Sequence, residues 1–189
     1  MEKIRVLFIA LLVGWSVCVY GEKKADHALF VKASPGVITS KVYYNSQDYE
    51  SFRGGMGIEA GYRCVLKKGY GFGLTYAHNK TEYKYGEKLD LNYIGPSFIY
   101  GSKIRERLQG SGEVGIGHAN YKLNNEKQNG VGIKASADIE YLLSSWLGVN
   151  AEMGWLMTIF SEKYHGYKID EPINGFYRVS VNVGIRLHL

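Results

Sequence analysis

The last fourteen residues, FYRVSVNVGIRLHL (176–189), alternate between apolar and polar side chains. Every second residue from Tyr177 to Leu189 is apolar, and none of the six residues between them carries a large apolar group. A period of two residues is typical of a β-strand whose two faces meet different surroundings. The stretch therefore predicts a long strand, either in a soluble sheet or across a membrane.

Seven further stretches alternate in the same way: 28–34, 52–66, 70–78, 89–101, 108–118, 131–143 and 146–159. No stretch has the spacing, cap and stop signal of a helix. Short connections alternate with long polar ones, at 35–51, 79–88, 119–130 and 160–175. This pattern predicts an all-β, eight-stranded antiparallel up-and-down transmembrane β-barrel with short periplasmic turns and four longer extracellular loops. Pro96 lacks an N–H donor, so we expect a bulge or a strand end there.

The N-terminus has the features of a secretory signal. Lys3 and Arg5 precede the apolar stretch VLFIALLVGWSVCVY, which is short for a membrane-spanning helix of roughly 20 residues. We expect residues 1–21 to be a cleaved signal peptide, 22–27 a short periplasmic segment and 28–189 the barrel domain. An N-terminal anchor helix is the alternative for the first segment.

The polar faces of the predicted strands carry five basic and five acidic residues: Arg53, Glu59, Arg63, Glu113, Lys134, Asp138, Glu140, Glu152, Arg178 and Arg186. In a transmembrane barrel the apolar faces contact lipid and these charges face the lumen. A one-residue slip of the last strand would turn Arg178 and Arg186 towards lipid, where a charge at the midplane costs about 2–4 kcal/mol. Buried charges need partners, and eight strands leave room only for side chains. We therefore expect paired charges to plug the lumen; a small pore is an alternative.

Two other patterns favour a membrane. Glycines cluster on the polar faces, where they leave room for long charged side chains: Gly55, Gly57, Gly61, Gly71, Gly73, Gly115, Gly117 and Gly148. Aromatic residues recur near strand ends, as in the girdles of outer-membrane barrels: Tyr62, Tyr70, Tyr93, Tyr100, Trp146, Phe160 and Tyr177. The same alternation is compatible with a soluble periplasmic lipocalin-like barrel, whose apolar faces point inward and bind an apolar ligand.

The signal peptide, the stretch YIGPSFIYG (93–101) and the terminal strand YRVSVNVGIRLHL (177–189) resemble small outer-membrane β-barrel proteins of the OmpA/OmpX-like type. More closely, the mature chain looks like the porin-like outer membrane protein beta-barrel domain family. The resemblance implies a location in the bacterial outer membrane, with lipid as a partner. It also implies that the barrel-insertion machinery recognises the C-terminal strand, through Tyr177, Val179, Val181, Val183, Ile185, Leu187 and Leu189. Such barrels often end in an aromatic residue, whereas this chain ends in Leu189.

The sequence does not predict an enzyme, a cofactor or a metal site. No histidine begins the His-x-Ser pair of lipid-deacylating barrels, and Asp26-His27 is the only adjacent Asp-His pair. His165 and Asp170 share the last loop, but no nucleophile is evident near them. The loops are instead rich in tyrosine, which is enriched at binding surfaces. We expect a structural, adhesion or surface-interaction role, with an extracellular ligand or host surface as partner and no nucleic acid.

Overall fold

The computed structural model describes residues 25–40, 42–44, 47–49, 53–82, 88–123, 126–160, 167–169 and 175–189. The predicted signal peptide and much of the predicted long loops lie outside these residues. Within the described part of the chain, no helix is long and apolar enough to cross a membrane.

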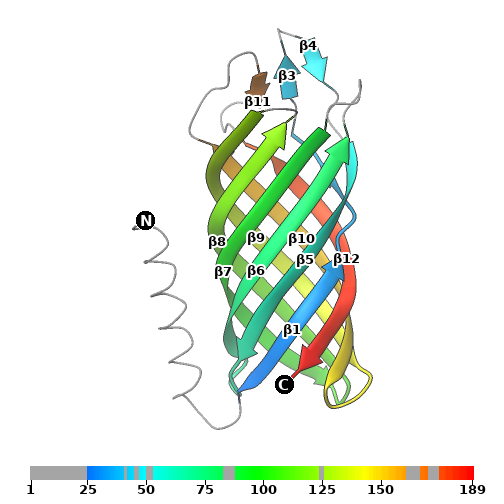
Figure 1. Cartoon of the computed structure of the whole chain (residues 1–189). Helices are drawn as coiled ribbons and strands as arrows, with labels where there is room; N and C mark the ends of the chain where they lie inside the picture. Colours follow the sequence, from blue (N-terminus) through cyan, green and yellow to red (C-terminus); the bar gives the residue numbers. More distant parts are fainter. Residues whose placement is uncertain are drawn as a thin grey trace.

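Nine strands form one closed antiparallel sheet, a tall barrel with tilted walls (Figure 1). They are β1 (Asp26–Ala33), β2 (Gly36–Ile38), β5 (Arg53–Val65), β6 (Tyr70–Glu82), β7 (Lys88–Arg105), β8 (Leu108–Leu123), β9 (Glu126–Leu142), β10 (Leu147–Phe160) and β12 (Tyr177–His188). β1 and β2 occupy one strand position in the barrel, because both pair with β5 on one side and with β12 on the other. The barrel is therefore eight-stranded, as predicted.

Three connections between neighbouring strands are short: 66–69, 106–107 and 143–146. All three lie at the same end of the barrel as the C-terminus (Figure 1). The first of them turns at Gly69, whose φ of 87° is a backbone conformation that only glycine adopts easily. We call this end the short-turn end and the opposite end the long-loop end.

The strands continue further towards the long-loop end than the sequence predicted. β6 runs to Glu82, β8 runs to Leu123 and β9 begins at Glu126, so much of the predicted loops 79–88 and 119–130 is strand. The ladder simply continues, with Lys80 opposite Asp90 and Asn120 opposite Asn129. The sequence analysis missed these parts of the strands because it interpreted runs of polar residues as loops.

Pro96 causes neither a bulge nor a strand end, in contrast to our expectation. It lies within β7 opposite Leu74 of β6. On the β8 side, the pairs Ile94–His118 and Ser97–Gly115 keep one register, and only the positions between them leave the ladder. A local gap in one ladder is thus enough to accommodate the missing N–H.

A second, three-stranded sheet stands above the long-loop end of the barrel (Figure 1). It consists of β3 (Val42–Tyr44), β4 (Gln47–Tyr49) and β11 (Tyr167–Ile169), all antiparallel. The register places Tyr167 opposite Tyr44, so this sheet joins the first and the last of the long connections. Four of its nine residues are tyrosines.

The outer surface of the barrel is apolar along most of its height. Ile116, Met153 and Val181 are 59%, 65% and 57% exposed, whereas charged residues at the same height of these strands, such as Glu113 and Glu152, are buried. A soluble protein shows the opposite distribution, with charges outside and large apolar side chains inside. In this part of the barrel the apolar faces point outward, which differs from the lipocalin-like alternative with its apolar faces inward.

Towards the long-loop end, the outer surface becomes polar. The register places His78, Asn92, Asn120 and Asn129 in one row across β6, β7, β8 and β9, and Lys80, Asp90, Lys122 and Lys127 in the next. Side chains link the first row, because Asn92 Nδ2 donates to Asn120 Oδ1 at 3.1 Å and Asn92 Oδ1 lies 2.7 Å from His78 Nδ1. These strands contain 13 to 18 residues, more than the 9–11 or so that cross a hydrocarbon core. The barrel is thus taller than the apolar part of its outer surface, which includes Ile116, Met153 and Val181 and which we call the apolar belt.

Candidate functional site in the barrel lumen

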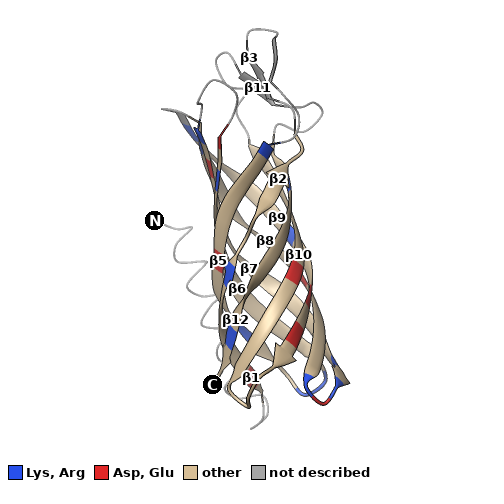
Figure 2. Ribbon diagram, turned by 90° about the vertical axis from the view of Figure 1, so that its right-hand side faces the viewer, with Lys and Arg blue, Asp and Glu red and all other residues tan. Residues whose placement is uncertain are grey.

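Charged side chains point into the lumen towards the short-turn end. Nine of the ten predicted lumen charges are buried: Glu59, Arg63, Glu113, Lys134, Asp138, Glu140, Glu152, Arg178 and Arg186. The tenth, Arg53, begins β5 near the long-loop end and is half-buried. Figure 2 shows charged positions within the barrel walls as well as at the turns. A charge held away from water needs an opposite charge and hydrogen bonds, so the partners of these residues matter most.

Lys134 is the centre of the first group of lumen charges. Its ammonium lies 3.3 Å from Glu59, 3.6 Å from Glu152 and 3.7 Å from Glu113, which come from three different strands. Glu152 also accepts a hydrogen bond from Lys32. The group therefore contains three carboxylates and two ammonium groups.

Neutral side chains complete this first group. Asn182 Nδ2 donates to Glu152 at 2.7 Å and to Glu59 at 3.2 Å, so one amide holds two carboxylates. The Thr75 hydroxyl donates to Glu113 at 2.9 Å. Hydrogen bonds of this kind are strong because one partner is charged.

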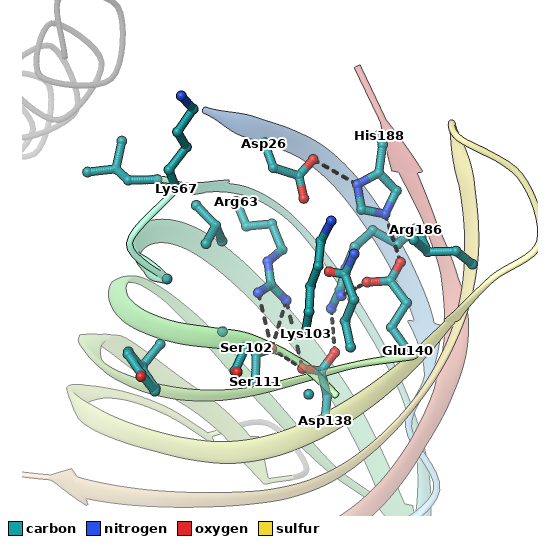
Figure 3. A pocket seen from close by; sticks show the side chains of 18 of the residues that line it. Asp26, Arg63, Lys67, Ser102, Lys103, Ser111, Asp138, Glu140, Arg186 and His188 are labelled. Carbon is teal, nitrogen blue, oxygen red and sulfur yellow. Dashed lines mark hydrogen bonds and ion pairs between the residues drawn. The ribbon is translucent and has the colours of Figure 1, made fainter. Parts of the chain in front are cut away.

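A second group of lumen charges lies nearer the short-turn end (Figure 3). The two terminal nitrogens of Arg186 donate to two carboxylates, Nη2 to Asp138 at 2.5 Å and Nη1 to Glu140. Arg63 lies 3.8 Å from Asp138 and donates to the Ser111 hydroxyl at 3.1 Å. Ser111 in turn donates to Asp138. The guanidinium fork suits such paired recognition, which a lysine could not reproduce.

His188 and Asp26 close this second group at the rim. His188 Nε2 lies 2.9 Å from Glu140 and its Nδ1 lies 2.8 Å from Asp26, so the ring links the lumen to the first residue of β1. Arg178 lies apart from both groups. It donates to the backbone oxygen and the hydroxyl of Ser34, where the wall passes from β1 to β2.

Buried apolar side chains form a cluster in the lumen towards the long-loop end. The buried cluster comprises Ile38, Ala77, Leu89, Leu91, Tyr93, Ala119, Tyr121, Leu123, Leu156, Phe160 and Phe176. At its centre the rings of Tyr121, Phe160 and Phe176 pack edge to face, with centroids 4.6 to 6.0 Å apart. Aromatic rings prefer this arrangement to face-to-face stacking.

The apolar cluster corrects our assignment of all apolar faces to lipid. Leu89, Leu91 and Tyr93 of β7 point inward, whereas Asp90 and Asn92 between them lie on the outer face. Tyr93 and Phe160 are 1% and 3% exposed, so they do not belong to an exposed aromatic girdle as we expected. Above the apolar belt the barrel is built like a soluble domain, with polar residues outside and an apolar core.

Tyr93 marks the junction between the apolar cluster and the charged groups. Its ring lies against Gly132, where a Cβ would come within 2.6 Å of Cδ2. Its hydroxyl lies over Gly95 and Gly115, and it has no hydrogen-bond partner among the described residues. Glycines at these positions therefore make the space that a tyrosine needs inside a narrow barrel.

Four partners of the predicted charges were missed by the sequence analysis. Lys32, Thr75, Ser111 and Asn182 all lie on inward faces of strands. Lys32 belongs to the short stretch 28–34, whose residues were not assigned to faces. The other three are small neutral residues that alternation shows as polar, without indicating that they hold a charge.

The residues considered for catalysis do not form a site in the described structure. His78 pairs with Asn92 on the outer face, and His27 lies 2.5 Å from the Tyr62 hydroxyl. His165 and Asp170 lie outside the described residues. Among the described residues, no group of three His, Cys, Asp or Glu side chains could hold a metal ion.

The apolar residues of the last strand lie on the outside of the barrel. Val181, Val183, Ile185, Leu187 and Leu189 are exposed, while Tyr177 and Val179 are half-buried. The inward residues Arg178, Asn182 and Arg186 form the hydrogen bonds and ion pairs described above. The structure thus keeps the register that the two arginines predicted.

No family model and no curated protein matches this sequence. Solved structures are similar in fold. Neisserial surface protein A (NspA) gives a TM-score of 0.62 at 14% identity, over 88% of this chain and 100% of that one. The outer membrane protein OprG from Pseudomonas aeruginosa gives 0.57 at 12% identity, over 89% and 98%.

Identities this low show the shared fold alone. Together with the apolar belt and the charged lumen, the fold defines this chain as a small eight-stranded β-barrel of the bacterial outer-membrane type, as its OmpA/OmpX-like features implied. In this class the short-turn end is periplasmic and the long-loop end is extracellular.

Proposed function

We propose that this protein is a closed outer-membrane barrel that does not conduct and acts at the cell surface. The observation that supports the proposal is that two successive layers of buried side chains lie in the lumen, the charged groups below and the apolar cluster above. A hydrated ion that passed one layer would meet the other. The small-pore alternative would need both layers to open.

The extracellular half supports the second part of the proposal. The walls extend beyond the apolar belt with a polar outer face and an apolar core, which gives a rigid stalk for the loops. The three-stranded sheet above the stalk is rich in tyrosine. Tyrosine gives a large contact area with a polar tip and loses little conformational entropy, so it is common in binding sites.

A binding experiment on whole cells tests this surface role. A bacterium expressing the full chain would be compared with one in which residues 42–49 are replaced by a Gly/Ser segment of equal length. The control variant replaces Asn124 and Asn125, in the connection between β8 and β9, by Gly and Ser. We expect attachment to a layer of cultured animal cells to fall only for the first variant. Equal attachment by all three strains, with barrels that still migrate as folded, would contradict an adhesive role for this sheet.

A further inference from the structure

A cavity of about 730 Å³ opens at the periplasmic end of the barrel (Figure 3). Its floor is the second charged group, with Arg63, Asp138, Glu140 and Arg186, and its rim is formed by the turn after β5 and the end of β7. Binding sites for small molecules have volumes of roughly 300–1,000 Å³.

The cavity carries an excess of positive charge. Five Lys or Arg residues and three Asp or Glu residues line it, an excess of two before His188 is counted. The three carboxylates already have partners, since His188 holds Asp26 while Arg186 holds Asp138 and Glu140. The uncompensated charges are therefore on the lysines.

The three lysines are Lys67, Lys68 and Lys103, and all are exposed. None forms an ion pair with an acidic side chain in the described part of the chain. In Figure 3, Lys103 extends into the space between Arg63 and Arg186, while Lys67 stands at the rim. Lysine acts as a compact point charge that commonly binds phosphate, and the Ser102 hydroxyl in the same wall can donate a hydrogen bond to a bound anion.

We propose that this cavity binds a phosphate-bearing anion from the periplasmic side, through Lys67, Lys68 and Lys103. The phosphate could belong to a soluble molecule or to the headgroup of an anionic phospholipid at the edge of the inner leaflet. The binding is independent of the proposed surface role, because it needs neither the extracellular stalk nor the loops.

The test is a titration of the refolded full-length barrel with inorganic phosphate, followed through the backbone amide signals of Gly69, Gly101 and Gly110. The binding variant is Lys67→Gln/Lys103→Gln. The control is Arg105→Gln/Arg107→Gln, which removes the same charge from exposed positions at the same end, outside the cavity. We expect saturable shifts in the native protein, the same shifts in the control, and affinity weakened about tenfold or more in the binding variant, because it loses two of the three lysines of the cavity.

Absence of saturable shifts at the cavity amides, or equal loss in both variants, would overturn the proposal. Single substitution Lys103→Gln provides a second measurement, with a smaller weakening expected. The source of the phosphate is found by comparing nanodiscs of phosphatidylcholine with nanodiscs that also contain phosphatidylglycerol. Shifts of the cavity amides without added phosphate would assign the site to a lipid headgroup, and shifts only with free phosphate would assign it to a soluble ligand.

Discussion

Lys32 on β1 and Glu152 on β10 form an ion pair inside the barrel, although β12 lies between their strands and 120 positions separate them in the sequence. Each side chain is about 1% exposed. Breaking such a pair from one side leaves a buried charge without compensation, which costs about 3–5 kcal/mol. The pair therefore links β1, where the barrel closes on β12, to the strand on the other side of β12.

Replacement of Lys32 by methionine should lower the free energy of unfolding by about 3 kcal/mol, because among the described residues Glu152 then keeps only Lys134 and Asn182 as partners. The measurement is urea-induced unfolding in lipid vesicles. Lys80→Met, on the exposed outer face, is the control and should change stability by about 0.5 kcal/mol or less. Equal effects of the two substitutions would mean that Lys32 is not a buried partner.

The carboxylates around Lys134 should respond differently to neutralisation. Glu152→Gln leaves Lys32 without an acidic partner and should destabilise the barrel by about 3 kcal/mol. Glu59→Gln leaves Lys134 with Glu113 and Glu152, and it removes the excess negative charge of the group. It should therefore be neutral or stabilising by up to about 1 kcal/mol in the same unfolding experiment. A larger loss for Glu59→Gln than for Glu152→Gln would contradict this distribution of charge.

The edge of the apolar belt can be found with arginine substitutions on the outer face of β8. Ile116→Arg should destabilise the folded barrel by about 2–4 kcal/mol, because a charge would face the hydrocarbon core. Asn120→Arg lies on the same strand in the polar region and should cost about 1 kcal/mol or less. Unfolding in vesicles measures both. Similar costs at the two positions would show that the belt does not end between them.

The space beside Tyr93 makes glycine necessary at position 132. Gly132→Ala would place a Cβ 2.6 Å from the buried ring, so the tyrosine must move. We expect a loss of about 1–3 kcal/mol in stability, as for other cases of overpacking. Gly54→Ala is the matched control on β5, since no heavy atom lies within 4 Å of its added Cβ. A wild-type stability for Gly132→Ala would show that Tyr93 is not confined.

The number of strands and the inward face of the last strand could be predicted from alternation. Arg178 and Arg186 fix the phase of the last strand, and the same reasoning placed Glu59, Lys134 and Glu152 on inward faces. A period of two shows which residues share a face, and a charge at the level of lipid shows which face must point inward. Within the apolar belt these two arguments agree.

Above the apolar belt, a charged residue no longer shows which face of its strand points inward. Leu91 and Tyr93 alternate with Asp90 and Asn92 just as residues of the belt alternate, but water replaces lipid outside and the faces exchange roles. The two-residue alternation does not indicate whether a residue lies at the level of the lipid or above it. Partners such as Lys32 and Glu152 were also beyond sequence reasoning, because the pairing depends on closure of the barrel.

Conductance across a planar lipid bilayer tests the closed lumen most directly. The full-length barrel would be inserted from detergent, and its folding would be verified by the difference in gel migration with and without boiling. A filled lumen predicts a stably inserted protein that gives no unitary current steps at any applied voltage that the bilayer tolerates. Reproducible steps that grow with salt concentration would show an open path through both layers and would contradict the account.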